Sequence, residues 1–153
     1  MADANQSTRA IFPDLLNNTI EDINSIKMAT KVKELKSVIL IIADDWKFDF
    51  YSNLMLMIEK TKNQAEIMKV LLKNEAFKSH SKLIGQLVTK ILKNVGKFTN
   101  YNLSKQKEHQ FFIDIKPIIQ RKFNCDVEVI LEQNSKSEKK SQALPGKPAI
   151  VIQ

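Results

Sequence analysis

A stripe of lysines at helical spacing is the feature of this sequence best suited to chemistry. Four lysines share a segment whose apolar residues repeat every three or four positions: Lys82, Lys90, Lys93 and Lys97. At 100° per residue, three of them (Lys82, Lys93 and Lys97) fall within about 60° of one another on a helix. Ammonium groups on a rigid helix attract phosphates without reading the base sequence. The stripe therefore predicts a phosphate-binding surface.

Five further lysines could extend this surface. Lys105 and Lys107 begin the next helical segment, and Lys139, Lys140 and Lys147 lie near the C-terminus, where they would close over a bound RNA. The net charge of the whole chain is +7, but residues 63–125 alone carry +8 and all other residues together carry −1. Such a basic block is typical of a polyanion-binding protein. The alternative is a solvated lysine-rich surface, since Lys, Asn and Ile are abundant throughout.

Residues for catalysis or metal binding are not grouped in this sequence. The two histidines, His80 and His109, have no Cys, Asp or Glu at ligand spacing, so we expect no metal site. Neither a phosphate-cradling loop nor a dinucleotide fingerprint fits a chain with three isolated glycines: Gly85, Gly96 and Gly146. We expect binding chemistry, with no cofactor on this chain.

The remaining polar residues have simple structural interpretations. Asp44 and Asp45 fit a helix N-cap, and Glu128 and Glu132 fit the solvent face of a strand. Cys125 fits a small buried residue better than a reactive thiol, and a lone cysteine is typical of a reducing compartment. The sequence shows no signal peptide and no apolar run of membrane-spanning length. We therefore expect a soluble cytoplasmic protein.

Hydrophobic periodicity predicts a helix-dominant α/β fold. Helices are expected over residues 12–26, 46–58, 65–72, 83–95 and 105–123, and strands over 35–43, 127–131 and 149–152. Pro117 should kink or divide the last helix, and Asn124 should end it in a left-handed conformation. The polar segment from Glu132 to Gln142 should be mobile. We expect a small sheet of about three strands packed by four to five helices, with the first strand parallel to a later one.

The aromatic side chains mostly occupy positions expected in the core. Phe98 and Tyr101, beside Lys97 and Lys105, are the exceptions. They could stack on bases of a single-stranded RNA, or they could plug the edge of the domain.

From roughly Asn18 onward the chain resembles the C-terminal region of archaeal-type leucyl-tRNA synthetases. Similar segments are the helix Ile20–Ile26 with its exit Thr30–Lys33, the strand Val38–Ala43 followed by Asp45-Trp46-Lys47-Phe48, the lysine-flanked Ser81–Val95, and Phe123–Val129. The most specific match is the closing segment Gln142–Ile152, which is similar to the family's Ala-x-Pro-x-x-Pro-Ala-Ile pattern. The chain departs from the family pattern at Asn124, where glycine is frequent, and at the internal Pro117.

The resemblance implies a tRNA-binding appendage that grips leucine tRNA, including its long variable arm. It divides the chain into residues 1–30, a tail and helix from the end of an anticodon-binding bundle, and residues 31–153, the C-terminal domain. It also implies that ATP and leucine are bound by a catalytic body absent from this chain, for which a separate synthetase subunit is one alternative. A DNA or membrane partner is not expected. A fragment, a split-gene subunit and a free-standing paralogue are all compatible with this interpretation.

A protein-interaction module is the second functional hypothesis. In that case the first helix would dock on a catalytic partner, because its apolar residues Leu15, Leu16, Ile20 and Ile23 would be poorly covered in so short a chain. Recovery of a partner after ribonuclease treatment would favour this hypothesis over RNA binding.

Overall fold

A three-stranded mixed sheet organises the fold in the computed structural model, which describes residues 13–97 and 104–153. The strand order is β2-β1-β3, with β1 (Ser37–Ile42) in the centre, β2 (Asp126–Leu131) parallel to it and β3 (Ala149–Ile152) antiparallel. The parallel pairing confirms the prediction from the long helical crossover. The helix-dominant α/β class with about three strands is also confirmed.

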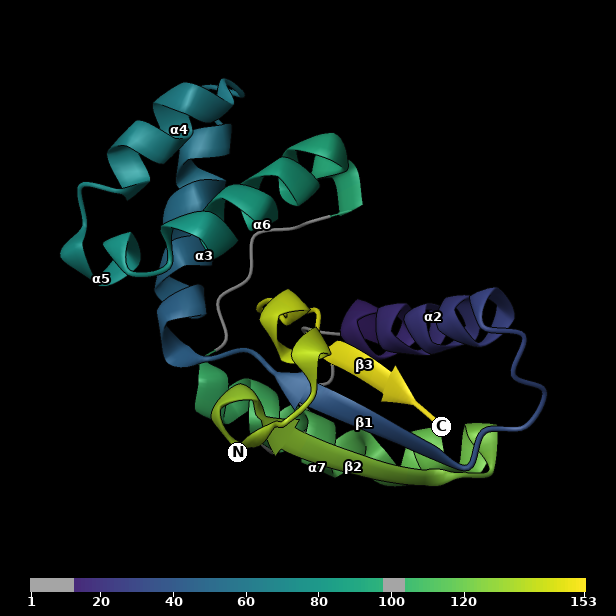
Figure 1. The fold of residues 1–153 in the computed structure, drawn as a ribbon. Helices are drawn as coiled ribbons and strands as arrows, with labels where there is room; N and C mark the ends of the chain where they lie inside the picture. The colour runs from purple at the N-terminus through teal and green to yellow at the C-terminus, as the bar shows by residue number, and fades with distance from the viewer. Residues whose placement is uncertain (1–12, 98–103) are drawn as a thin grey trace, which may run out of the picture.

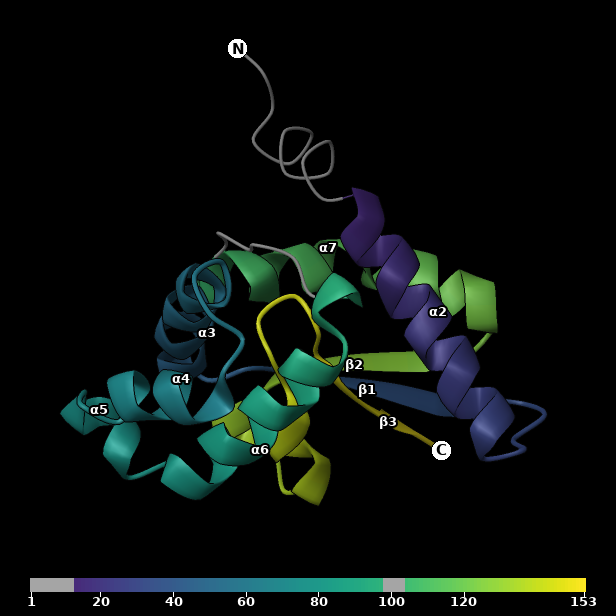
Figure 2. The same cartoon turned by 90° about the horizontal axis from the view of Figure 1, so that it is seen from above.

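One face of this sheet is covered by two helices. The buried side chains of Val38, Leu40 and Ile42 in β1 belong to a core that also contains residues of α2 (Pro13–Ala29) and α7 (Lys105–Phe123). Helix α7 packs along β2 and β1, and α2 packs along β3 (Figures 1 and 2). The core on this face of the sheet therefore combines side chains of α2, which precedes β1, and of α7, which precedes β2.

The remaining helices form a second group, here called the helical lobe. It contains α3 (Asp45–Ile58), α4 (Gln64–Leu71), α5 (Glu75–Lys78) and α6 (Ser81–Lys93), and it extends from the end of β1 (Figure 1). Its interior is built from fully buried apolar side chains, among them Phe50, Leu54, Ile67 and Ile84. The short α5 is absent from the predicted helices, because a single turn is too short to show a periodic pattern.

Local capping explains where the helices begin and end. Asp44 caps α3, as predicted, by accepting a hydrogen bond from the backbone N–H of Asp45, and Ser104 likewise caps α7. Asn124 ends α7 in the left-handed region (φ 51°, ψ 51°), which confirms that prediction. The sequence predicts a kink or a division of this helix at Pro117; the division is wrong, because α7 continues through Pro117, and the kink stays a prediction. Pro117 is exposed, so water can replace the missing N–H donor on that side of the helix.

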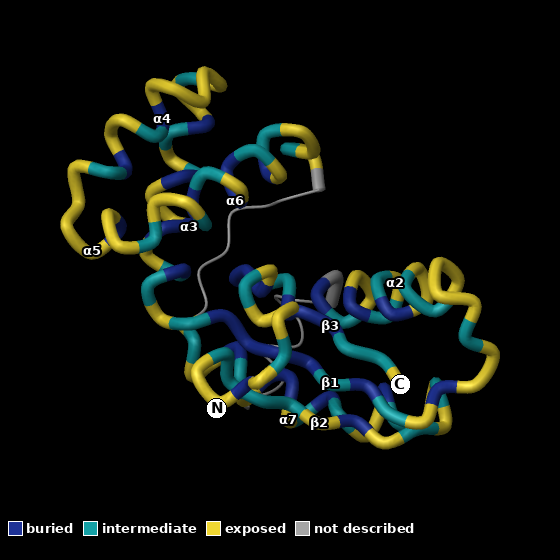
Figure 3. Tube along the Cα trace, viewed as in Figure 1, coloured by how far each residue is buried: buried dark blue, intermediate teal, exposed yellow. Residues whose placement is uncertain are grey.

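The polar segment between β2 and β3 is folded rather than an extended link. It forms two 3-10 helices, η2 (Glu132–Asn134) and η3 (Glu138–Gln142), and Ser135 between them is buried. The segment covers part of the second face of the sheet, where Ala143 packs against Ile41. Figure 3 shows this mixture of buried and exposed backbone beside β3.

Candidate nucleic-acid interface

Helix α6 separates an apolar side from a basic side, as its sequence predicts. Its buried side chains belong to the core of the helical lobe and are Ile84, Leu87, Val88 and Ile91. Lys82 and Lys93 are exposed and lie about 20° apart on the helix wheel, whereas Lys90 is about 80° from Lys82. All three lysines are exposed, but only Lys90 lines the hollows beside this helix, so the stripe is divided here into an outer part, Lys82 and Lys93, and an inner part, Lys90.

Among the described residues, none of the ion pairs involves Lys82, Lys90 or Lys93. The RNA hypothesis requires these ammonium groups to stay unpaired, which agrees with the ion pairs of the described residues, and RNA binding by these lysines stays a prediction. Lys97 lies in the 3-10 helix η1 (Val95–Lys97), but its side chain is outside the description.

The inner part of the stripe faces a groove between the helical lobe and the sheet, here called the interlobe groove. It consists of two adjoining hollows, each of about 390 Å³, which share Lys90 and Gln142. Helix α6 forms one wall; α2, η3 and the segment leading into β3 form the other (Figure 1). The charged side chains that line it are Asp22, Lys90, Lys139 and Lys147.

Electrostatics in the groove leave positive charge in excess. Partial burial lowers the pKa of Lys90, the nearby charge of Lys147 lowers it further, and Asp22 opposes both effects. Lys90 is still exposed over much of its surface, so its ammonium group can meet a ligand from solvent. The Lys147 Nζ lies 3.9 Å from a carboxylate oxygen of Asp22, a long and partly exposed ion pair. Among the described residues that line the groove, one carboxylate thus lies with three lysines.

A tight turn before β3 places Lys147 in the groove. Leu144 and Lys147 exchange two backbone hydrogen bonds (3.0 and 2.8 Å), and Gly146 between them has a positive φ of 77° that side chains other than glycine rarely adopt. The backbone N–H of Gly146 donates to the buried carboxylate of Glu108 on α7. Leu144 is fully buried. The turn is therefore fixed to the core on one side and presents Lys147 on the other.

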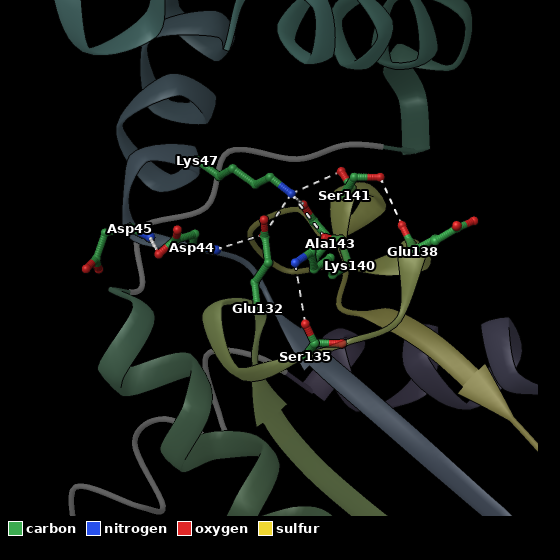
Figure 4. Close-up of polar contacts among 9 residues, drawn as sticks. All are labelled: Asp44, Asp45, Lys47, Glu132, Ser135, Glu138, Lys140, Ser141 and Ala143. Atoms are coloured by element: carbon green, nitrogen blue, oxygen red, sulfur yellow. Dashed lines mark hydrogen bonds and ion pairs between the residues drawn. The ribbon is translucent and has the colours of Figure 1, made fainter. Parts of the chain in front are cut away.

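A buried lysine fixes the segment that precedes this turn. Lys47 in α3 is completely buried, forms an ion pair with Glu132 at 2.8 Å, and donates to the carbonyl oxygens of Ser141 (3.0 Å) and Ala143 (2.8 Å) (Figure 4). Burial lowers the pKa of Lys47, and the hydrogen bond and charge of Glu132 oppose that shift. Glu132 is therefore an internal counter-ion, and its predicted role on the solvent face of a strand is wrong.

The other predicted lysines differ in whether they line this groove or contact other parts of the protein. Lys105 pairs with Asp45 at 3.0 Å and is largely covered, whereas Lys107 is exposed. The Lys139 ammonium donates to the Ile150 carbonyl oxygen at 3.3 Å and lines the groove, and the Lys140 ammonium donates to the Ser135 carbonyl oxygen at 3.4 Å. The structure thus brings together Lys90, Lys139 and Lys147 and leaves Lys105 engaged elsewhere.

The structure shows the surroundings of His80. The ring of His80 stacks on that of Trp46, with centroids 4.0 Å apart and planes within 4°. Across residues 13–97 and 104–153, no group of three or more His, Cys, Asp or Glu could hold a metal ion. Phe98 and Tyr101 lie outside the described residues.

Sequence reasoning missed three charged residues of this region: Lys47, Glu108 and Asp22. A signal existed for two of them, because Lys47 and Glu108 occupy positions in phase with apolar stripes. Lys47 continues the buried series of Phe50, Tyr51, Leu54 and Ile58, and Glu108 continues that of Phe111, Phe112, Ile115 and Ile119. A charge in such a position predicts an internal partner. Asp22 gave no comparable signal, since it is an ordinary polar residue of an amphipathic helix.

Comparison with known proteins supplies a family context for this geometry. The chain is 32% identical over 142 residues to leucine–tRNA ligase of Methanococcus maripaludis, and 26% and 27% identical over 140 residues to those of Pyrococcus abyssi and Methanocaldococcus jannaschii. Each match covers 92% of this chain. The chain resembles archaeal leucine–tRNA ligases. This likeness to the ligases confirms the resemblance inferred from the motifs and is consistent with their C-terminal region. No family model matches the chain.

The match to these ligases is partial on their side. The chain spans about 14% of the length of the ligases of the three organisms. None of the described helices is both long and apolar enough to cross a membrane.

Proposed function

We propose that this domain binds leucine tRNA, including its variable arm, and serves aminoacylation by a catalytic body outside this chain. The likeness to leucine–tRNA ligases supports the choice of tRNA as the partner. The observation that carries the proposal is the pair of exposed lysines on α6, Lys82 and Lys93, which no carboxylate of the described residues neutralises. ATP and leucine would be bound by the catalytic body, and no cofactor is assigned to this chain.

Phosphate contacts explain how such a surface would work. Lysine ammonium groups on a rigid helix make sequence-independent contacts with backbone phosphates, and each contact releases condensed counterions. Affinity should therefore fall steeply with salt, with a slope of about 0.7 to 0.9 per contact in a plot of log affinity against log salt. Recognition of leucine tRNA over other tRNAs would then come from the shape of its long variable arm.

The direct test reverses the charge of the outer lysines. Lys82→Glu/Lys93→Glu should weaken binding of leucine tRNA to the full 153-residue chain by about tenfold or more at 0.1 M salt, since it removes two contacts and adds repulsion. The matched control is Lys69→Glu/Lys73→Glu, which places the same charge change on exposed residues of α4 and the turn after it. Fluorescence anisotropy with labelled tRNA measures the affinity, and circular dichroism checks the fold.

Two results would contradict the proposal. Equal binding by the wild type and Lys82→Glu/Lys93→Glu would remove the lysines of α6 from RNA binding. Equal loss in the variant and the control would mean that net charge alone drives association. A leucine tRNA that lacks its variable arm should bind more weakly than the intact tRNA.

The structure overturns the clue that favoured a protein-interaction module. Leu15 and Ile23 of α2 are buried, at 6% and 0% exposure, and Leu16 and Ile26 pack against the same core. Of the four residues in that clue, Leu15 and Ile23 are therefore covered by the chain itself, Leu16 packs against the core, and Ile20 is half-buried.

A further inference from the structure

The interlobe groove has the chemistry of an anion site rather than of a base-binding pocket. Its charged lining consists of three lysines and one carboxylate, and its neutral polar lining is Ser25, Gln86, Asn94, Ser141 and Gln142. None of the described residues that line it is aromatic, so these residues offer bases no stacking platform. Each hollow of 390 Å³ would hold about a dozen waters, which is enough room for a phosphate group with part of its sugar.

The folded core also fixes the backbone positions of Lys90 and Lys147 before any ligand arrives. Lys90 is carried by α6, whose apolar side is buried in the helical lobe. Lys147 is carried by the turn that Glu108 fixes through the Gly146 N–H. The two ammonium groups are close enough for the charge of Lys147 to lower the pKa of Lys90. An anion between them would convert this repulsion into two attractive contacts at little conformational cost.

We propose that the interlobe groove is a binding site for one backbone phosphate of RNA, held by Lys90 and Lys147 with Lys139 at its edge. This inference rests on the proposed tRNA-binding function and deepens it. Lys82 and Lys93 lie on the same helix, outside the groove, so a strand that crosses them can continue into it. Asp22 occupies the place of the anion when RNA is absent, through its long contact with Lys147.

The test compares charge removal inside and outside the groove. Lys90→Gln/Lys147→Gln is compared with Lys82→Gln/Lys93→Gln on the outer surface and with Lys69→Gln/Lys73→Gln as the control for lost charge. Affinity for leucine tRNA is measured from 0.05 to about 0.3 M salt, a range in which counterion release is resolved. The groove variant should bind about tenfold more weakly at 0.1 M salt, and its salt slope should fall by about 0.7 to 0.9, the value for one lost phosphate. Thermal unfolding confirms that each variant is folded.

The outcomes separate this inference from the proposed function. If only the outer pair weakens binding, RNA binding stands and the groove assignment is refuted. If neither pair differs from the control, both proposals fail. A loss confined to the groove variant would support the groove site and refute the role of Lys82 and Lys93 in the proposed function.

A variant that should raise the affinity for tRNA, instead of lowering it, provides a second test. Asp22→Asn should strengthen tRNA binding by about twofold to fivefold, because it removes one competitor of the phosphate for Lys147, with the strength of an exposed ion pair. Unchanged or weaker binding would refute the role given to Asp22.

Inorganic phosphate distinguishes a free anion from an RNA backbone as the ligand. Millimolar phosphate should stabilise the wild type only weakly against heat, because a single phosphate lacks the neighbouring contacts of a strand. Strong stabilisation by phosphate, lost in Lys90→Gln/Lys147→Gln without loss of tRNA affinity, would assign the groove to a free anion and overturn the proposal.

Discussion

Replacing the buried Lys47 with methionine should destabilise the domain by about 3 kcal/mol. Methionine keeps an unbranched chain of similar length, so the change removes mainly the ammonium group and its bonds. Glu132 then loses its ion-pair partner, and the carbonyl oxygens of Ser141 and Ala143 lose their donor. Removing one member of a buried ion pair costs about 3–5 kcal/mol. The lower end applies here because the Glu132 side chain is 13% exposed and can recover some hydration.

Urea unfolding followed by circular dichroism measures this loss. A destabilisation of about 3 kcal/mol corresponds to a fall in Tm of about 6–12 °C for a domain of this size. Lys60→Met is the matched control on an exposed lysine just after α3, and its effect should stay within about 0.5 kcal/mol. Hydrogen exchange should also become faster in η3, whose carbonyl groups Lys47 holds.

The reasoning is refuted if Lys47→Met costs less than about 1 kcal/mol, the size expected for an exposed pair. The double variant Lys47→Met/Glu132→Gln provides an independent check. Because it removes both charges, it should be less destabilised than the sum of the two single variants. Additive effects would mean that the two side chains do not interact in solution.

Two further predictions concern alkaline pH and helix termination. Burial raises the pKa of Tyr51 from its ordinary value of 10.0 to about 12. Between these two pH values the phenol keeps its proton in the folded state and loses it in the unfolded state. Stability should therefore fall as pH rises from about 10, at no more than about 1.4 kcal/mol per pH unit, and Tyr51→Phe should lack this part of the fall. Tyrosinate absorbance measures the same titration, and a Tyr51 that ionises near 10 would contradict the prediction. Lys31 follows α2 with a positive φ of 60°, a conformation that glycine adopts more easily than other residues. Lys31→Gly should therefore stabilise the domain by about 1 kcal/mol, whereas Lys31→Ala should not raise the Tm measured by thermal unfolding.

Several elements of this protein follow from local sequence patterns. The apolar spacing of residues 81–95 predicts α6 and the side of it that carries lysines, because helical period alone decides which side chains share a face. The β-branched residues of β1 and β3 predict strands for the same local reason. Asn124 predicts the left-handed end of α7, since its side chain tolerates positive φ. The short α5 escapes this kind of reasoning because one turn contains no full period.

The candidate site depended on contacts between segments far apart in the chain. Lys47 bonds to Ala143 across 96 residues, and Glu108 bonds to Gly146 across 38, so neither partner could be read from spacing. The sequence by itself determined which residues are charged and which helix face they occupy. Tertiary packing decided that Lys90 and Lys147 share a groove while Lys105 pairs with Asp45. The physical reason is that periodicity acts over a few residues, whereas charge pairing and desolvation depend on which surfaces the folded core brings together.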